Sequence, residues 1–341
     1  MVPAGCENAV PPRKPSTPDR DPREILVIKP SSLGDVVHTL PAVALLKRRW
    51  PDAHLHWLIN PEWAPLLEGN PYVDEAILFP RQELRGGRGL LRIAPWARGL
   101  RGRVRPDLIV DFQGLLRSAL IARLCLVDGG QIVGMGDARE GAPFFYHRKA
   151  DMRGFDHAVD RCFAIVAALG IPISQPLEWP LPEGQPPAGF AETPPFVLLH
   201  PFARGTGKSL SAADATILCR ALAPMRVVLA GRSEESVAPL GNVEDLLNRT
   251  SLAELIWLIR RAAFVVSVDS GPMHIAAALT SRLLAIHTWT DPREYGPYQP
   301  EAWIWKDGAL FQAGARRDGA NRQPAVDMSA VAQFLRTQVA L

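Results

Sequence analysis

The sequence has few of the features that mark specialised classes of protein. Only four of its 341 residues are cysteines, and their wide spacing offers no CxxC motif, zinc ligand set or disulfide framework. Such sparse cysteine usage fits a reducing cytoplasm. No uncharged apolar run reaches the roughly 20 residues that cross a bilayer. The Gly-rich dinucleotide fingerprint is also missing, which argues against an NAD enzyme, and a D-x-D metal motif occurs only at Asp19–Asp21.

Charge of either sign is nearly balanced. The formal net charge is +3, so the composition predicts no nucleic-acid partner. Basic residues do gather in one place: from Arg81 to Arg105 there are eight arginines and a single acid, Glu83. This local excess fits either an anionic partner or a solvated, mobile loop.

The length and the 47% hydrophobic content suit two domains. Buried-type strands alternate with helical patterns, which predicts an α/β fold with parallel sheets covered by helices. Residues 1–23 are rich in proline and charge, and we expect a disordered tail there. We expect an N-terminal domain over 24–171 and a C-terminal domain over 196–325. Between them lies a stiff linker with eight prolines, 172–195, and a terminal helix occupies 326–341. The linker and the terminal helix are candidate hinge elements.

The first strand–turn–helix unit carries a candidate catalytic carboxylate. The apolar run Ile25–Ile28 predicts a strand buried on both faces, and small residues, including Ser32 and Gly34, form the turn before a helical pattern. Ligands bind at such carboxyl ends of parallel strands. Asp35, at the far edge of this turn, fits equally a catalytic group or a simple helix N-cap.

A second turn of the same kind lies in the C-terminal half, at Ser267–His274. Ser270 and Gly271 begin a helix whose free N–H groups favour an anion such as phosphate. Asp269 suits hydrogen bonds from sugar hydroxyls, or capping of that helix. His274 lies on the same helix face as Ser270, although on its own it is better explained as a histidine satisfied by a neighbouring loop.

Two further segments offer charged groups for a ligand. Lys208 follows Gly207, but Phe202 stands where a P-loop needs glycine, so we interpret it as a single cation near a diphosphate or as an exposed lysine. Glu234 and Glu235 follow the next strand. They fit either hydrogen bonds from a ribose or the favourable first turn of a helix.

The segment Ile28–Asp35, with His38 and Leu40-Pro41 after it, closely resembles the amino-terminal motif of the family 9 glycosyltransferases. These are the bacterial ADP-heptose:lipopolysaccharide heptosyltransferases, and the heptosyltransferase I branch is the nearest. Further segments agree in order and spacing: Asp111–Ser118, Ala138–Glu140 with Phe145-Tyr146, His157–Arg161, Ser267–His274 and Thr290–Pro292.

This resemblance implies a GT-B fold, with two Rossmann-like domains facing across a cleft. It implies inverting transfer without a metal or other cofactor, from ADP-heptose or a similar nucleotide sugar to an anionic, Kdo-containing lipopolysaccharide core. It also implies a cytoplasmic enzyme in peripheral contact with the inner membrane. The implied roles are catalysis by Asp35 as base and by Lys208 at the diphosphate, donor binding by Asp269, Ser270, Gly271, His274 and either Glu234 or Glu235, and acceptor binding by Ser32, Gly34, Arg117 and Arg139.

The sequence departs from the family pattern near the donor site. Leu210 stands near the position of a family tryptophan, the loop before Lys208 is one residue longer, and Ser270–Met273 replaces Thr-Gly-Leu-Ser. These departures leave the donor base and sugar open. The alternatives are a glycosyltransferase with another nucleotide sugar, a nucleotide-sugar epimerase or hydrolase of the same fold, and a non-catalytic sugar-nucleotide-binding protein.

Overall fold

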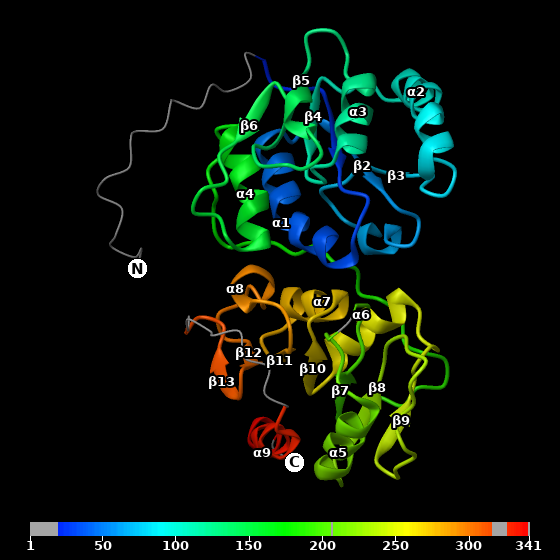
Figure 1. Ribbon diagram of the computed structural model, residues 1–341, viewed down its shortest axis with the longest axis vertical. Coiled ribbons are helices and arrows are strands. Elements are labelled where there is room, and N and C mark those ends of the chain that lie inside the picture. Colours follow the sequence, from blue (N-terminus) through cyan, green and yellow to red (C-terminus); the bar gives the residue numbers. More distant parts are fainter. Residues whose placement is uncertain (1–19, 206, 316–325, 340–341) are drawn as a thin grey trace, which may run out of the picture.

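The computed structural model describes residues 20–205, 207–315 and 326–339. The chain forms two α/β domains stacked on one another, with the N-terminal domain at the top of Figure 1. Residues 1–19 of the expected tail lie outside the described residues. The end of that tail is held on the domain, because Trp50 Nε1 donates to the Asp21 carboxylate at 2.9 Å and Arg23 N–H bonds to Asp107.

The N-terminal domain is built on a six-stranded sheet with the order β3-β2-β1-β4-β5-β6, in which every pair of neighbours is parallel. Along β1, Ile25 and Val27 pack with α1 and α4 on one face, and Leu26 and Ile28 pack with α2 and α3 on the other. This confirms the strand buried on both faces. Its elements are β1 (Glu24–Ile28), α1 (Leu33–Arg49), β2 (His54–Ile59), η1 (Ala64–Leu67), β3 (Glu75–Leu78), α2 (Gly86–Arg103), β4 (Leu108–Asp111), α3 (Leu116–Cys125), β5 (Gln131–Met135), η2 (Ala142–Phe145), β6 (Arg148–Ala150) and α4 (Ala158–Ala168).

The C-terminal domain repeats this plan with a seven-stranded sheet of order β13-β12-β11-β10-β7-β8-β9. The sheet is parallel except for the pair β12 and β13. Helices α5 and α9 cover one face and α6 and α7 the other. Its elements are β7 (Phe196–His200), α5 (Ala212–Leu222), β8 (Arg226–Leu229), β9 (Val243–Asp245), α6 (Leu252–Arg261), β10 (Phe264–Val268), α7 (Gly271–Leu279), β11 (Leu283–His287), α8 (Pro292–Tyr295), β12 (Trp303–Lys306), β13 (Ala309–Gln312) and α9 (Met328–Gln338).

The two domains meet where α1 and α7 begin, and glycine makes this close contact reciprocal. A Cβ on Gly34 of α1 would lie 2.5 Å from His274 Cδ2 on α7. A Cβ on Gly271 of α7 would lie 2.4 Å from Leu33 Cδ2 on α1. Each helix therefore needs glycine where the other presents a side chain. One hydrophobic cluster runs through this contact from one domain into the other.

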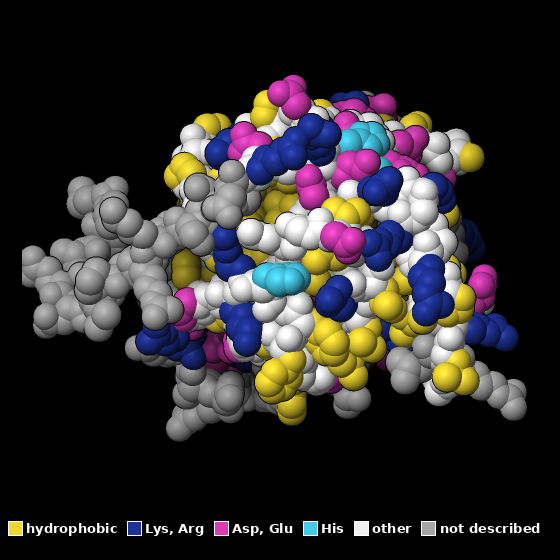
Figure 2. Space-filling model, turned by 90° about the horizontal axis from the view of Figure 1, so that it is seen from above, with side chains coloured by type: hydrophobic (Ala, Val, Ile, Leu, Met, Phe, Trp, Pro, Cys, Tyr) yellow, Lys and Arg dark blue, Asp and Glu magenta, His cyan; other side chains and the backbone are white. Residues whose placement is uncertain are grey.

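Most of the arginine-rich segment forms helix α2, over Gly86–Arg103, instead of a mobile loop. α2 continues through the exposed Pro95 because Ile93, Ala97 and Leu100 on one face are buried against the sheet and α3. Arg92, Arg98, Arg101, Arg103 and Arg105 are exposed. Figure 2 views the molecule from this domain's outer end, where Lys and Arg side chains are spread among apolar ones.

The two expected hinge elements differ from each other in how they pack. The linker is ordered along α6, since Arg260 donates to the carbonyls of Leu181 and Pro182 and Gln185 N–H donates to Ala253. The terminal helix α9 stays within the C-terminal domain, where Arg336 binds the carbonyl of Ala221 on α5. It does not join the two domains, so that expectation is wrong. Within the described part of the chain, no helix combines the length and the apolar character needed to cross a membrane.

Candidate active site

Asp35 is fixed at the start of α1. Ser32, not Asp35, is the N-cap, and Asp35 occupies the third helical position. Its Oδ2 accepts hydrogen bonds from the Ser32 N–H at 2.9 Å and from Ser32 Oγ at 2.6 Å. The carboxylate thus supports the helix start and is held in one place by it. Its side chain is still 44% exposed, so a ligand can reach it.

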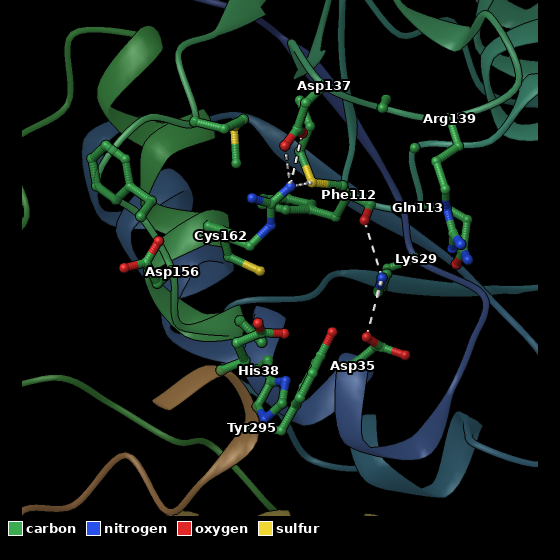
Figure 3. A pocket seen from close by; sticks show the side chains of 18 of the residues that line it. Lys29, Asp35, His38, Phe112, Gln113, Asp137, Arg139, Asp156, Cys162 and Tyr295 are labelled. Carbon is green, nitrogen blue, oxygen red and sulfur yellow. Dashed lines mark hydrogen bonds and ion pairs between the residues drawn. The ribbon is translucent and has the colours of Figure 1, made fainter. Parts of the chain in front are cut away.

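Lys29, the residue that follows β1, controls the charge of Asp35. Its Nζ lies 3.8 Å from Asp35 Oδ1 and donates to the carbonyl of Phe112 at 3.1 Å (Figure 3). Burial raises the pKa of the Asp35 carboxyl, but Lys29 and the bonds from Ser32 outweigh it, so the pKa lies below its usual value. Asp35 is therefore ionised at neutral pH and able to accept a proton.

Asp35 opens into a cavity of about 810 Å³ whose lining comes from both domains. The N-terminal domain contributes His38, Arg139 and Arg161, and the C-terminal domain contributes α8 with Tyr295. Figure 3 shows Asp35, His38 and Tyr295 around the lower part of this space. The predicted acceptor residue Arg139 lies on its wall. The lining residues do not include Arg117, which the resemblance had paired with Arg139.

The second predicted carboxylate is held far more tightly. Asp269 Oδ2 accepts hydrogen bonds from Lys208 Nζ and Thr290 Oγ1, each at 2.7 Å, and its side chain is 5% exposed. Burial raises the pKa of this carboxyl, yet its surroundings, chiefly His287 and then His274, lower it below the usual value. The structure thus brings Lys208 and Asp269 together as an ion pair. Asp269 does not cap α7, whose N-cap is Ser270.

His274 connects the two turns. Its Nδ1 lies 2.9 Å from Nε2 of His38 on α1, and its Nε2 lies 3.7 Å from Asp269 Oδ1. Burial lowers the pKa of His274 to about 4, against the opposing effect of Asp269 and Asp35. The ring is therefore neutral at pH 7. The partner of His274 is a histidine of the other domain, rather than the neighbouring loop that its position on the helix suggests.

The start of α7 is less open than its sequence predicts. Ser270 Oγ bonds to the carbonyl of Val268 at 3.0 Å and lies 3.4 Å from His200 Nδ1. The space beside Gly271, expected to admit an anion, is filled by Leu33 of α1. Gly271 therefore serves the contact between the domains in this structure, and donor binding at this turn stays a prediction.

Glu234 and Glu235 make different contacts, which indicates different roles. No helix follows β8 in this segment, so the interpretation of two acids in the first turn of a helix is wrong. Glu235 Oε2 accepts the N–H of Ala212 at 3.0 Å and supports the start of α5. Glu234 is exposed. Of the two, Glu234 is the one whose carboxylate is left for a ligand.

A family model described as glycosyltransferase family 9 (heptosyltransferase) matches residues 96–315, more than half of the chain. The chain belongs to glycosyltransferase family 9. It is 30% identical over 300 residues to lipopolysaccharide heptosyltransferase 1 of Pseudomonas aeruginosa, a match that covers 80% of this chain and 81% of that protein.

Two solved heptosyltransferase structures share the GT-B fold of this glycosyltransferase. The structure of E. coli heptosyltransferase WaaC with ADP has a TM-score of 0.71 at 25% identity and covers 93% of this chain and 100% of that one. The E. coli ADP-heptose lps heptosyltransferase II has a TM-score of 0.73 at 22% identity, with 92% and 98% covered. The fold predicted from the family motifs is confirmed.

Several polar residues of this family 9 glycosyltransferase were missed by sequence reasoning. Lys29 lies inside the Ile28–Asp35 motif. However, a lysine that follows a strand gives no local indication that it will pair with a carboxylate six residues later. Arg161 lies on the cavity wall, where it pairs with Asp137 at 2.8 Å. The only sequence signal for it was its position in the His157–Arg161 segment. Tyr295 is near both Glu294 and Asp35, which together with burial raise the pKa of its phenol.

Proposed function

We propose that this glycosyltransferase transfers heptose from ADP-heptose to a Kdo-containing acceptor of the lipopolysaccharide inner core. The observation that carries the proposal is the accessible, ionised carboxylate of Asp35 at a cavity lined by both domains. The relatives named as lipopolysaccharide heptosyltransferase 1 support the substrates. So does the resemblance of the motif around Asp35 to that family.

The proposed reaction is a single displacement that inverts the anomeric carbon. Asp35 accepts the proton of an acceptor hydroxyl while that oxygen forms a bond to the anomeric carbon of heptose. The bond between this carbon and the diphosphate oxygen breaks, and ADP leaves with the electron pair. The Ser32 bonds keep Asp35 in place, and the nearby Lys29 keeps it ionised.

Lys208 is proposed to stabilise the negative charge that develops on the leaving diphosphate. In this structure its Nζ is bound to Asp269, which holds it at the end of β10. A fixed ammonium placed at developing charge lowers the barrier as a metal ion does in other transferases. We therefore expect transfer to proceed at the same rate in the presence of EDTA.

The acceptor side is proposed to be the N-terminal domain. Arg139 brings positive charge to the cavity wall, as an acceptor with carboxylates requires, whereas the charge of Arg161 is balanced there by Asp137. The exposed arginines of α2, together with Leu91, whose side chain is 80% exposed, fit peripheral contact with an anionic membrane surface at the inner face of the inner membrane.

The test is donor selection followed by transfer. Calorimetric titration with ADP-heptose, UDP-sugars and GDP-sugars should give heat of binding for ADP-heptose at the lowest concentration. Adding a Kdo-containing acceptor should then release ADP and form a heptosylated product. Tighter binding of a UDP- or GDP-sugar would contradict the donor. Conversion of ADP-heptose without acceptor would instead indicate an epimerase or hydrolase.

A further inference from the structure

A cluster of two histidines and a glutamate lies at the opposite end of the N-terminal sheet from Asp35. His54 and His56 belong to β2, and Glu75 is the first residue of β3. One possible ligand atom from each side chain lies within 4.8 Å of the other two. The amino ends of the strands face away from the other domain, on the side viewed in Figure 2, where histidine and acidic side chains lie side by side.

The sequence builds this cluster through strand geometry. Side chains two residues apart in a strand point to the same face, so the His-x-His pattern places both imidazoles together. The parallel register pairs His56 with Glu75 and His54 with Glu24 of β1. Three adjacent strands thus present two histidines and two glutamates on one face of the sheet. The two imidazole rings are 4.5 Å apart between centroids.

His56 is the residue of the cluster whose surroundings most favour a bound cation. Its side chain is 5% exposed, with Nδ1 2.9 Å from Glu75 Oε2 and Nε2 3.6 Å from Glu24 Oε2. A neutral imidazole carries one N–H, so one of its nitrogens must turn a bare lone pair toward a carboxylate. Among the described residues, Nε2 has no hydrogen-bond partner.

The other charged groups around the cluster leave room for an ion. Arg103 at the end of α2 pairs with Glu75 Oε1 at 2.7 Å, and it is 63% exposed, so it can move away. Glu24 Oε2 also accepts the backbone N–H of Arg105 at 2.8 Å. Asp74 lies 3.7 Å from His54 Nδ1 but is already bound by Lys47 at 2.7 Å.

We propose that His54, His56 and Glu75 form a binding site for a divalent transition metal ion of the zinc type, with water as fourth ligand. Imidazole nitrogen and carboxylate oxygen, which these side chains supply, are common ligands of zinc in proteins. Tetrahedral ligands with bonds of about 2 Å stand about 3.3 Å apart, so small side-chain rotations close the site. The ion ties β3, an edge strand, to the centre of the sheet and takes no part in transfer.

The test uses the full-length chain without an affinity tag. After dialysis against Zn²⁺ and then against metal-free buffer, elemental analysis should find one zinc per chain. Addition of Co²⁺ to the metal-free protein should give the visible absorption of a tetrahedral cobalt site. Zinc should raise the melting temperature, and EDTA should reverse this rise.

Variants distinguish this site from casual binding. His54→Ala and Glu75→Gln should each weaken zinc binding at least tenfold, whereas His147→Ala, at an exposed histidine of the same domain, should leave it unchanged. His54 is 53% exposed on its side chain, so its removal leaves the fold intact. Equal zinc uptake by His54→Ala and the wild type would overturn the proposal, as would no uptake by either.

The result is separable from the proposed transfer reaction. Because the cluster lies at the amino ends of the strands and Asp35 beyond their carboxyl ends, His54→Ala should keep the full rate of ADP release. A protein that binds zinc at this cluster but transfers no heptose would retain the metal site and reject the proposed function.

Discussion

The two strand-to-helix turns at the domain contact each carry an aspartate, and the two are held in opposite ways. Asp35 is bonded by its own N-cap residue, lies 3.8 Å from one lysine and keeps 44% of its side chain exposed. Asp269 is bonded by Lys208 and Thr290 and is 5% exposed. The same local fold thus leaves one carboxylate accessible to a ligand and uses the other to hold a cation.

Replacing the open carboxylate should have the largest effect. Asp35→Asn removes the proton acceptor while keeping the shape of the side chain, so the transfer rate should fall about 10²- to 10⁴-fold. ADP should bind with an unchanged Kd, measured by calorimetry. Full transfer by this variant would contradict the role of Asp35 as proton acceptor, because Asp35 would then be only a structural residue of α1.

Removing the cation of the other turn should rank second. Lys208→Ala should lower transfer about 10²- to 10³-fold, since the leaving diphosphate loses a fixed positive charge. Lys208→Arg should recover part of the rate. The measurement is kcat and KM for the donor. An equal loss in the alanine and arginine variants would mean that charge is not what Lys208 supplies.

The contact between the two turns is tested by its glycines. Gly34→Ala places a methyl group against His274, and overpacking of this kind costs about 1–3 kcal/mol in the free energy of unfolding. Gly99→Ala in α2 is the matched control, because a Cβ there meets nothing within 4 Å. It should stabilise the protein by about 0.5–1 kcal/mol. Chemical denaturation measures both. Equal effects would show that the helices do not meet so closely.

The difference in charge control between the turns predicts a pH effect. Lys29 lowers the pKa of Asp35, so Lys29→Met should raise that pKa. Transfer is lost as the pH falls through this pKa, and the acidic limb of the kcat/KM profile should therefore move to higher pH. Lys29→Arg keeps the charge and should keep the wild-type limb. An unmoved limb in the methionine variant would separate Lys29 from Asp35.

The smallest effects should come from the two adjacent glutamates. Glu234→Gln should raise the donor KM a few-fold and leave the melting temperature unchanged, because its carboxylate is free for a ribose. Glu235→Gln removes the charge that supports α5 and should cost about 0.5–1 kcal/mol in stability. The reverse pattern would assign the donor contact to Glu235.

The longer elements of the fold could be predicted because their pattern is local. The apolar strands β1, β7 and β10 and the helix α6 follow from runs of buried residues. The short strands β6 and β9 have three residues each, with little apolar pattern, and exist because a neighbouring strand offers hydrogen bonds. Helix α2 was not predicted, because glycines and Pro95 interrupt its pattern, and it forms because Ile93, Ala97 and Leu100 are buried on one face.

The candidate site was predictable only in part, for a related reason. The family motifs indicated Asp35, Lys208 and Asp269. The ion pair between Lys208 and Asp269 is consistent with the expectation that both lie near the donor. The His38–His274 contact joins residues 236 positions apart, and no local pattern predicts it. The filling of the Gly271 space by Leu33 likewise depends on how the domains meet.

The central claim is that Asp35 acts as a base in a single displacement, and the anomeric configuration of the product tests it most directly. Proton NMR of the heptosylated acceptor formed from ADP-heptose of known configuration reports this in one spectrum. We expect the opposite configuration to that of the donor. Retained configuration would contradict it, because the reaction would then need a nucleophile that bonds to the sugar.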